Sequence, residues 1–226
     1  MILRELHTYL EKYNLRNQPL APLSVRLLLS LGYGYTTYFS YSNLLLEKTN
    51  NFSLVTMLGP TYLLDILSVL IGWKTMIGWN QNDVLKHHIP SLISFFCVDN
   101  IAPNSKVGLL MLTSSIHEFF FVISTFGKNI YINFIRYWFG LFWYFTFDIM
   151  ISFETGYLIG KKLIHQKIII LILELLLIKM HTNFTYLRWK KTLNVPFSKN
   201  GYSALHIFAF AYGIYKNFIS NMFSKN

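Results

Sequence analysis

The sequence predicts an all-α protein, a polytopic bundle of about seven transmembrane helices. Three features support this fold class: hydrophobic side chains make up 53% of the 226 residues, charged side chains make up only 13%, and the apolar residues gather in long stretches. A water-soluble domain carries about 25% charged residues, so this chain has too few charges to cover a surface that faces water. The expected surroundings of the folded chain are therefore a lipid bilayer.

Seven apolar stretches predict the individual helices, because a helix that crosses a membrane needs about 20 residues. They cover residues 27–46, 53–73, 83–98, 107–126, 130–153, 163–178 and 201–218. The first stretch contains no charged residue, whereas each of the others holds at least one ionisable side chain. Glycine and proline within them do not exclude helices, since neighbouring helices in a membrane satisfy the freed backbone groups.

The chain divides into an N-terminal part, residues 1–48, and a transmembrane domain, residues 49–226. The first part contains the first apolar stretch, and ahead of it apolar residues recur at helical spacing: Ile2, Leu3, Leu6, Leu10 and Tyr13. This spacing predicts an amphipathic helix on the membrane surface, with a solvated tail as an equal alternative. No long apolar core of a cleavable signal peptide occurs there.

Basic residues indicate how the bundle is oriented, because short cytoplasmic loops are enriched in lysine and arginine. A seven-helix arrangement with a cytoplasmic N-terminus places 13 of the 20 basic residues on the cytoplasmic side. It places the glycosylation sequon at Asn51 outside and the sequon at Asn183 inside. The pair His87-His88 then lies at the cytoplasmic end of the third helix.

The net charge of +10 does not indicate a nucleic-acid partner, because the basic residues are scattered between apolar stretches instead of forming one dense patch. A basic group at Arg188, Lys190 and Lys191 is expected to form a cytoplasmic loop near anionic lipid headgroups. The single cysteine, Cys97, excludes an intrachain disulfide and a Cys-rich metal site.

The seven histidines lack the repeated H-x-x-x-H and H-x-x-H-H patterns that would bring many imidazoles together around two irons. A single metal ion held by His87 or His88 together with His117 and Glu118 is an alternative, since imidazole and carboxylate groups suit zinc. Nothing in the linear spacing fixes three ligands together. We therefore expect no metal and no cofactor, and favour an acid/base site.

The adjacent histidines His87 and His88 are the most informative local feature, because neighbours on a helix point about 100° apart. Pro90 follows closely and suits a first helical turn, which predicts that the pair lies near the start of its helix. The helix dipole there disfavours imidazolium, leaving a neutral base. Asp83, four residues before His87, is expected to orient that ring. Two interfacial histidines without chemistry are the alternative.

Four carboxyl groups fall inside apolar stretches: Asp65, Glu118, Asp148 and Glu174. Each costs about 2.5–3.5 kcal/mol at membrane depth unless it is paired, protonated or facing a cavity. Hydrogen bonds that only hold helices together are a serious alternative for Asp148 and Glu174. Glu118 follows His117 on the helix after the histidine pair, at about 12 Å from the cytoplasmic end at 1.5 Å per residue, so the two motifs are expected to meet in one polar cavity.

Three groups of residues in this order resemble the TLC (TRAM–LAG1–CLN8) domain family: the Tyr-Leu-Leu-Asp run that ends at Asp65, the run from Asp83 to His87-His88, and His117-Glu118. The resemblance covers residues 54–145. It implies a barrel of about six helices around a lipid cavity, within residues 49–226, preceded by one extra helix.

For ceramide synthases of that family the resemblance implies transfer of an acyl group from acyl-CoA to a sphingoid amine. His87 or His88 would be the base or acyl-accepting nucleophile, assisted by Glu118. Residues that orient this group or bind substrate would be Asp65, Asp83, His117 and Asp148. The sequence departs from the full motif at Phe95-Phe96, at Cys97 and at Phe121, where a second acid is expected, which favours the broader family over ceramide synthesis itself.

The expected function is lipid homeostasis by a protein of the endoplasmic reticulum or another endomembrane that binds acyl lipid or acyl-CoA in an intramembrane cavity. The first alternative is a ceramide synthase-like, acyl-CoA-dependent N-acyltransferase. The second is a non-catalytic membrane chaperone or cargo receptor. The expected partners are membrane lipids and fatty acyl chains, with a homodimer left open, and a seven-helix receptor is disfavoured because its Asp-Arg-Tyr and Asn-Pro-x-x-Tyr motifs are absent from the sequence.

Overall fold

The computed structural model describes residues 18–46, 52–76, 81–127, 130–159, 162–193 and 195–223. Within these ranges the fold is helical, and the backbone pairing outside helices is one isolated bridge between Leu20 and Lys74. The helices are α2 (Leu23–Leu45), α3 (Leu54–Leu70), α4 (Gln81–Ile101), α5 (Lys106–Leu112), α6 (Ser115–Ile123), α7 (Ile130–Phe145), α8 (Phe147–Ile159), α9 (Ile164–Thr192) and α10 (Lys199–Phe223). The expected amphipathic segment at residues 2–13 lies outside the described residues.

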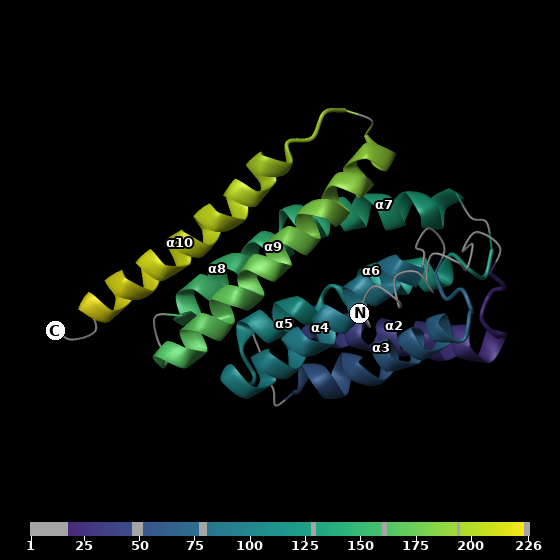
Figure 1. Cartoon of the computed structure of the whole chain (residues 1–226), viewed down its shortest axis with the longest axis horizontal. Helices are drawn as coiled ribbons and strands as arrows, with labels where there is room; N and C mark the ends of the chain where they lie inside the picture. Colours follow the sequence, from purple (N-terminus) through teal and green to yellow (C-terminus); the bar gives the residue numbers. More distant parts are fainter. Residues whose placement is uncertain are drawn as a thin grey trace, which may run out of the picture.

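The described helices form seven rods, because two predicted stretches are each interrupted once. One break separates α5 from α6 at Thr113 and Ser114, and another separates α7 from α8 at Thr146. Each rod corresponds to one of the seven apolar stretches of the sequence. In the view of Figure 1, α2 and α3 lie along one edge of the molecule and α10 lies along the other, with α4, α5, α6, α8 and α9 between them.

Two of the described rods are long and apolar enough to cross a membrane on length and composition alone. They are Lys106–Ile123, formed by α5 and α6, and Ile164–Lys190 within α9. The first is mostly buried within the bundle, whereas only 33% of the second is buried. Helix α3 (Leu54–Leu70) is apolar but shorter. The prediction of an all-α protein is therefore confirmed, while a membrane crossing by all seven rods remains a prediction.

The histidine pair does not lie at a helix start, contrary to the prediction. Helix α4 begins at Gln81, so His87 and His88 lie in its second turn and beyond, and Pro90 lies inside the helix. The proline removes one backbone donor, and the Ser91 hydroxyl donates to the His87 carbonyl at 2.7 Å beside it. The argument from the helix dipole therefore does not apply to these histidines.

Helix α9 inverts the polarity that a helix has in a water-soluble protein. Its buried positions recur every three or four residues: Ile170, Glu174, Ile178, His181, Thr185 and Arg188. Its exposed positions between residues 168 and 176 are apolar and include Ile168, Ile172, Leu175 and Leu176. Polar side chains therefore gather inside the bundle and hydrophobic side chains outside, although a helix in water buries its apolar stripe.

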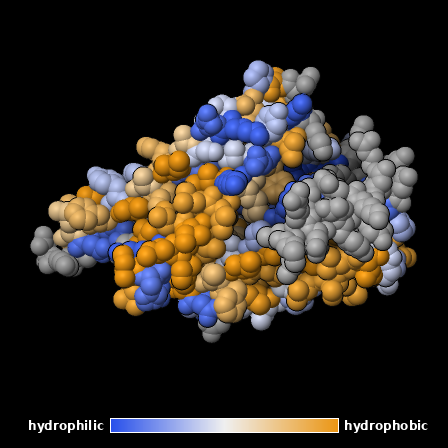
Figure 2. All heavy atoms as spheres, in the orientation of Figure 1, coloured by the Kyte–Doolittle hydropathy of each residue, from blue (hydrophilic) through white to orange (hydrophobic). Residues whose placement is uncertain are grey.

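Helices α2 and α10 show the same inversion. Their buried residues include Thr36, Ser40 and Asn43 of α2 and His206 and Asn217 of α10. Large apolar side chains of both helices are exposed: Leu27, Leu28, Leu31, Tyr35 and Tyr38 of α2, and Ile207, Phe208, Tyr215 and Phe218 of α10. Figure 2 shows hydrophobic residues over broad continuous areas of the face in view. A water-soluble monomer rarely exposes apolar patches of this size.

Helices α8 and α10 approach each other closely through two glycines. A Cβ atom at Gly156 would clash with the Phe210 carbonyl, and a Cβ atom at Gly213 would clash with the Phe153 carbonyl. Small residues at such crossings let two helix backbones come together, as in membrane bundles. This contact holds Asp148 of α8 and His206 of α10 at the same depth in the bundle.

Candidate functional site

A first buried network joins α2, α3 and α4 around the carboxyl group of Asp65. His88 Nε2 lies 2.7 Å from Asp65 Oδ2, and both side chains are fully buried. The Tyr33 hydroxyl donates to the same oxygen at 3.3 Å, and the rings of Tyr62 and His88 pack with centroids 4.0 Å apart. A hydrogen bond at one nitrogen fixes a histidine's tautomer and ring orientation. Asp65 therefore fixes the tautomer and the ring orientation of His88.

The other histidine of the pair contacts α6 instead. His87 Nε2 lies 3.0 Å from Glu118 Oε1, and the Tyr62 hydroxyl donates to the same oxygen at 3.4 Å. The structure thus brings the histidine pair and the His117-Glu118 motif together, as the sequence predicts. Glu118 is thus the carboxylate at His87 Nε2, and orientation of the ring by Asp83 stays a prediction.

A second buried network joins α8, α9 and α10 around Asp148. His181 Nδ1 lies 2.6 Å from Asp148 Oδ1, and the Tyr202 hydroxyl donates to Oδ2 at 3.0 Å. His206 Nε2 is 3.3 Å from the same Oδ2, while its Nδ1 is hydrogen-bonded to Ser152 Oγ at 2.6 Å. Asp148 therefore orients His181 and His206.

His117 takes part in a third arrangement, with Arg188 of α9. The guanidinium group donates to His117 Nδ1 at 3.0 Å and lies over the rings of Phe121 and Tyr144. Arg188 is only 7% exposed, so the expected cytoplasmic loop at this residue is wrong. The reason is that α9 continues to Thr192, 14 residues past its predicted end at residue 178, and carries Arg188 into the bundle.

Two adjoining cavities lie against these networks. One is lined by His87 of α4 and His181 of α9, with apolar residues from α5, α7, α8 and α9, and has a cavity volume of about 40 Å³. The two histidine rings have centroids 6.4 Å apart. The two histidines therefore form a polar side of a cavity that is otherwise lined mostly by apolar residues.

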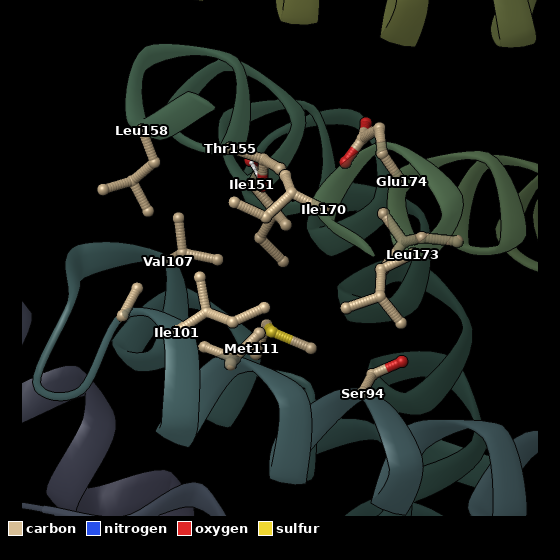
Figure 3. Close-up of a pocket in the computed structure, with 13 residues that line it drawn as sticks. Ser94, Ile101, Val107, Met111, Ile151, Thr155, Leu158, Ile170, Leu173 and Glu174 are labelled. Carbon is tan, nitrogen blue, oxygen red and sulfur yellow. Dashed lines mark hydrogen bonds between the residues drawn. The ribbon is translucent and has the colours of Figure 1, made fainter. Parts of the chain in front are cut away.

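The second cavity lies between α4, α5, α8 and α9 and also has a volume of about 40 Å³. Its lining is almost entirely apolar, with Glu174 as its only charged residue (Figure 3). The two cavities share four lining residues: Ser94, Met111, Ile151 and Leu177. They therefore form one groove with the histidines at one end and an aliphatic compartment at the other.

The pairing of histidines with carboxylates assigns chemical roles to single atoms. If His87 Nε2 donates to Glu118 and His181 Nδ1 donates to Asp148, His87 Nδ1 and His181 Nε2 are the nitrogens that can accept a proton. Two such imidazoles beside one cavity can act as bases, and either one can act as an acid after it has taken up a proton. Within the part of the chain that the structure describes, no group of three or more His, Cys, Asp or Glu side chains is arranged to hold a metal ion.

The sequence analysis missed His181, which lines the same cavity as His87. It also missed the tyrosines Tyr33, Tyr62 and Tyr202, which donate to the buried carboxylates. The apolar stretch that predicts α9 ends at residue 178, so His181 fell outside every predicted span. The helical repeat from Glu174 through His181 to Arg188, in steps of seven, is the signal that would have found it.

The geometry of the site has to carry any functional argument, because one helical architecture hosts many unrelated activities. A comparison of this chain with protein-family models, with curated proteins and with solved structures finds no match.

Proposed function

We propose that this chain is an integral membrane protein that binds the acyl chain of a lipid or of acyl-CoA in the groove beside His87 and His181. The observation that carries the proposal is that α2, α9 and α10 expose many apolar side chains and bury polar ones, which in α9 and α10 include Glu174, His181 and His206. That arrangement is favourable when the surroundings are hydrocarbon and the interior is a polar or ligand-filled cavity.

The groove supports an amphiphilic ligand, because its two ends differ in chemistry. The aliphatic compartment between α5, α8 and α9 suits hydrocarbon, and His87 with His181 suits a carbonyl, carboxyl or thioester group. Ligand pockets commonly combine an apolar lining with a few polar groups that fix orientation. By this proposal the protein acts in lipid homeostasis within an endomembrane such as the endoplasmic reticulum, as a TLC-type barrel.

A second candidate function, acyl transfer from acyl-CoA to an amine, is favoured by the presence of two histidines at one cavity. One imidazole would take the proton as the amine nitrogen bonds to the thioester carbonyl carbon. The carbon–sulfur bond then breaks, and the thiolate of coenzyme A takes up a proton. A pocket that excludes water favours this reaction over hydrolysis. The helices would then serve both binding and catalysis.

The test is a lipid and product assay on purified, detergent-solubilised protein. Lipid extracted from the protein is identified by mass spectrometry, and a panel of acyl-CoAs is supplied with sphingoid and other amine acceptors. The same assays are run on the His87→Ala/His88→Ala double variant and on His165→Ala, a matched control in which an exposed histidine of α9 is removed.

Product that is formed by the parent protein and by His165→Ala, and lost in a folded double variant, would support acyl transfer. Copurifying lipid without product would support binding alone. If the parent holds no lipid and forms no product, the proposal is wrong and a chaperone or cargo receptor becomes the better explanation. In that case replacement of His87 and His88 would change partner binding or folding and leave the lipid chemistry unaffected.

A further inference from the structure

The aliphatic compartment of the groove contains one carboxyl group, Glu174, which the networks around the histidines do not use. The side chain is 4% exposed, and its Oε1 atom has no hydrogen-bond partner among the described residues. In Figure 3 the carboxyl group turns from α9 toward Thr155 and Ile151 of α8, which also line the compartment. Such a group is costly in an apolar interior without a partner.

Contacts within the bundle account for only part of this carboxyl group. Ser152 of α8 lies within hydrogen-bonding reach of Glu174, but its hydroxyl is also hydrogen-bonded to His206. Thr155 donates its hydroxyl proton to the Ile151 carbonyl at 2.7 Å and so is not a donor to Glu174. One oxygen of the carboxyl group is therefore left for a ligand in the compartment.

The position of Glu174 relative to the histidines is fixed by helix α9. Glu174 and His181 are seven residues apart, two turns on the same buried stripe, which corresponds to about 10 Å at 1.5 Å per residue. An extended chain whose polar end meets His87 and His181 would pass Ile151 and Leu177 and reach the carboxyl group partway along its length. A plain hydrocarbon chain would leave that carboxyl group unsatisfied.

We infer that the ligand is an aliphatic chain with a hydroxyl group along its length, which bonds Glu174 while the polar end of the chain meets His87 and His181. This inference rests on the proposed lipid-binding function and names its ligand class. A hydroxyl group donates to an ionised carboxylate and accepts from a protonated one, so it suits Glu174 in either state. A methylene group at that place does neither.

The experiment measures the displacement of a fluorescent fatty acid from the purified protein in detergent. The competitors are stearate and a series of monohydroxystearates that differ only in the position of the hydroxyl group. We expect at least one isomer to compete about tenfold better than stearate, which is the effect of one added buried hydrogen bond. That preference disappears in Glu174→Leu and is retained in Glu174→Gln, whose amide both donates and accepts.

Leu173→Met is the matched control, because Leu173 lines the same compartment without a polar group, and its hydroxyl preference is expected to match the parent's. Unchanged stearate competition in Glu174→Leu shows that this variant folds. Equal competition by stearate and every isomer, or a preference that survives Glu174→Leu, would overturn the inference while leaving lipid binding intact. Failure of every fatty acid to compete, stearate included, would contradict the proposed function as well.

Discussion

Four histidines in the bundle interior lie against a carboxylate: His88 against Asp65, His87 against Glu118, and both His181 and His206 against Asp148. Both side chains of every pair are buried, with none more than 7% exposed, and burial of such groups is costly without their partners. Removal of one partner therefore has a larger effect than the removal of an exposed side chain. The pairs fix ring orientation as well as helix position.

The Asp65→Ala variant is expected to be less stable than the parent by about 3–5 kcal/mol, because it leaves His88 buried without its carboxylate. The measurement is thermal unfolding in detergent, followed by circular dichroism. His165→Ala, at an exposed position, is the control and is expected to unfold with the parent. Equal melting temperatures for Asp65→Ala and the control would show that the pair does not stabilise the fold.

The sequence predicts part of this residue-level arrangement. Charged residues are rare within the apolar stretches, and water cannot solvate them at membrane depth. The sequence therefore predicts that Asp65, Glu118 and Asp148 are interior groups. It does not reveal which histidine each carboxylate meets, because that depends on how the helices are rotated about their axes. Asp83, one turn from His87 in sequence, and Glu118 are both predicted to assist that ring, and the structure shows the contact from Glu118 of another helix.

At the scale of helices, composition locates the rods but not their ends. The seven apolar stretches match seven rods, because hydrophobic runs of this length have few other stable arrangements. Helix α9 extends to Thr192, although its apolar run ends at residue 178, since buried polar residues such as His181 and Arg188 continue the same helical face. Hydropathy alone would assign the residues after 178 to a loop.

The close contact of α8 and α10 leads to a prediction for its glycines. Gly156→Leu is expected to destabilise the protein by about 1–3 kcal/mol, because the new side chain must push the Phe210 carbonyl, and α10 with it, away from α8. Thermal unfolding of the purified variant measures the effect. Gly127→Ala is the control, since nothing lies within 4 Å of a Cβ atom there. Similar melting temperatures for both variants would mean that α8 and α10 can separate at little cost.

At the scale of the whole molecule, the distribution of polar residues indicates the solvent. The interior contains five buried histidines and four buried carboxyl groups: His87, His88, His117, His181, His206, Asp65, Glu118, Asp148 and Glu174. The exterior is rich in exposed leucine, isoleucine, phenylalanine and tyrosine (Figure 2). The core also contains apolar residues such as Leu58, Leu110 and Trp143, but a water-soluble monomer rarely exposes so much apolar surface. The exposed apolar surface supports the proposed membrane location independently of any single helix.

Ile172→Lys distinguishes the two solvents. In water, a lysine at this exposed position changes the stability of a protein by less than about 0.5 kcal/mol. In a bilayer, the same lysine costs about 2.5–3.5 kcal/mol near the centre of a helix, so the variant is expected to integrate poorly. Carbonate extraction of membranes measures integration, with Ile172→Leu as the control. Parent-like integration of Ile172→Lys would argue against a lipid-facing α9.

The central claim is that an acyl chain occupies the groove between α4, α5, α8 and α9, and photolabelling tests it most directly. A fatty acid that carries a photoreactive group near its chain end is bound to the purified protein and irradiated, and labelled peptides are mapped by mass spectrometry. The claim predicts labels on groove residues such as Met111, Ile151 and Leu177, which excess unlabelled fatty acid suppresses. Labels confined to outward-facing residues such as Phe208 and Tyr215 would contradict it.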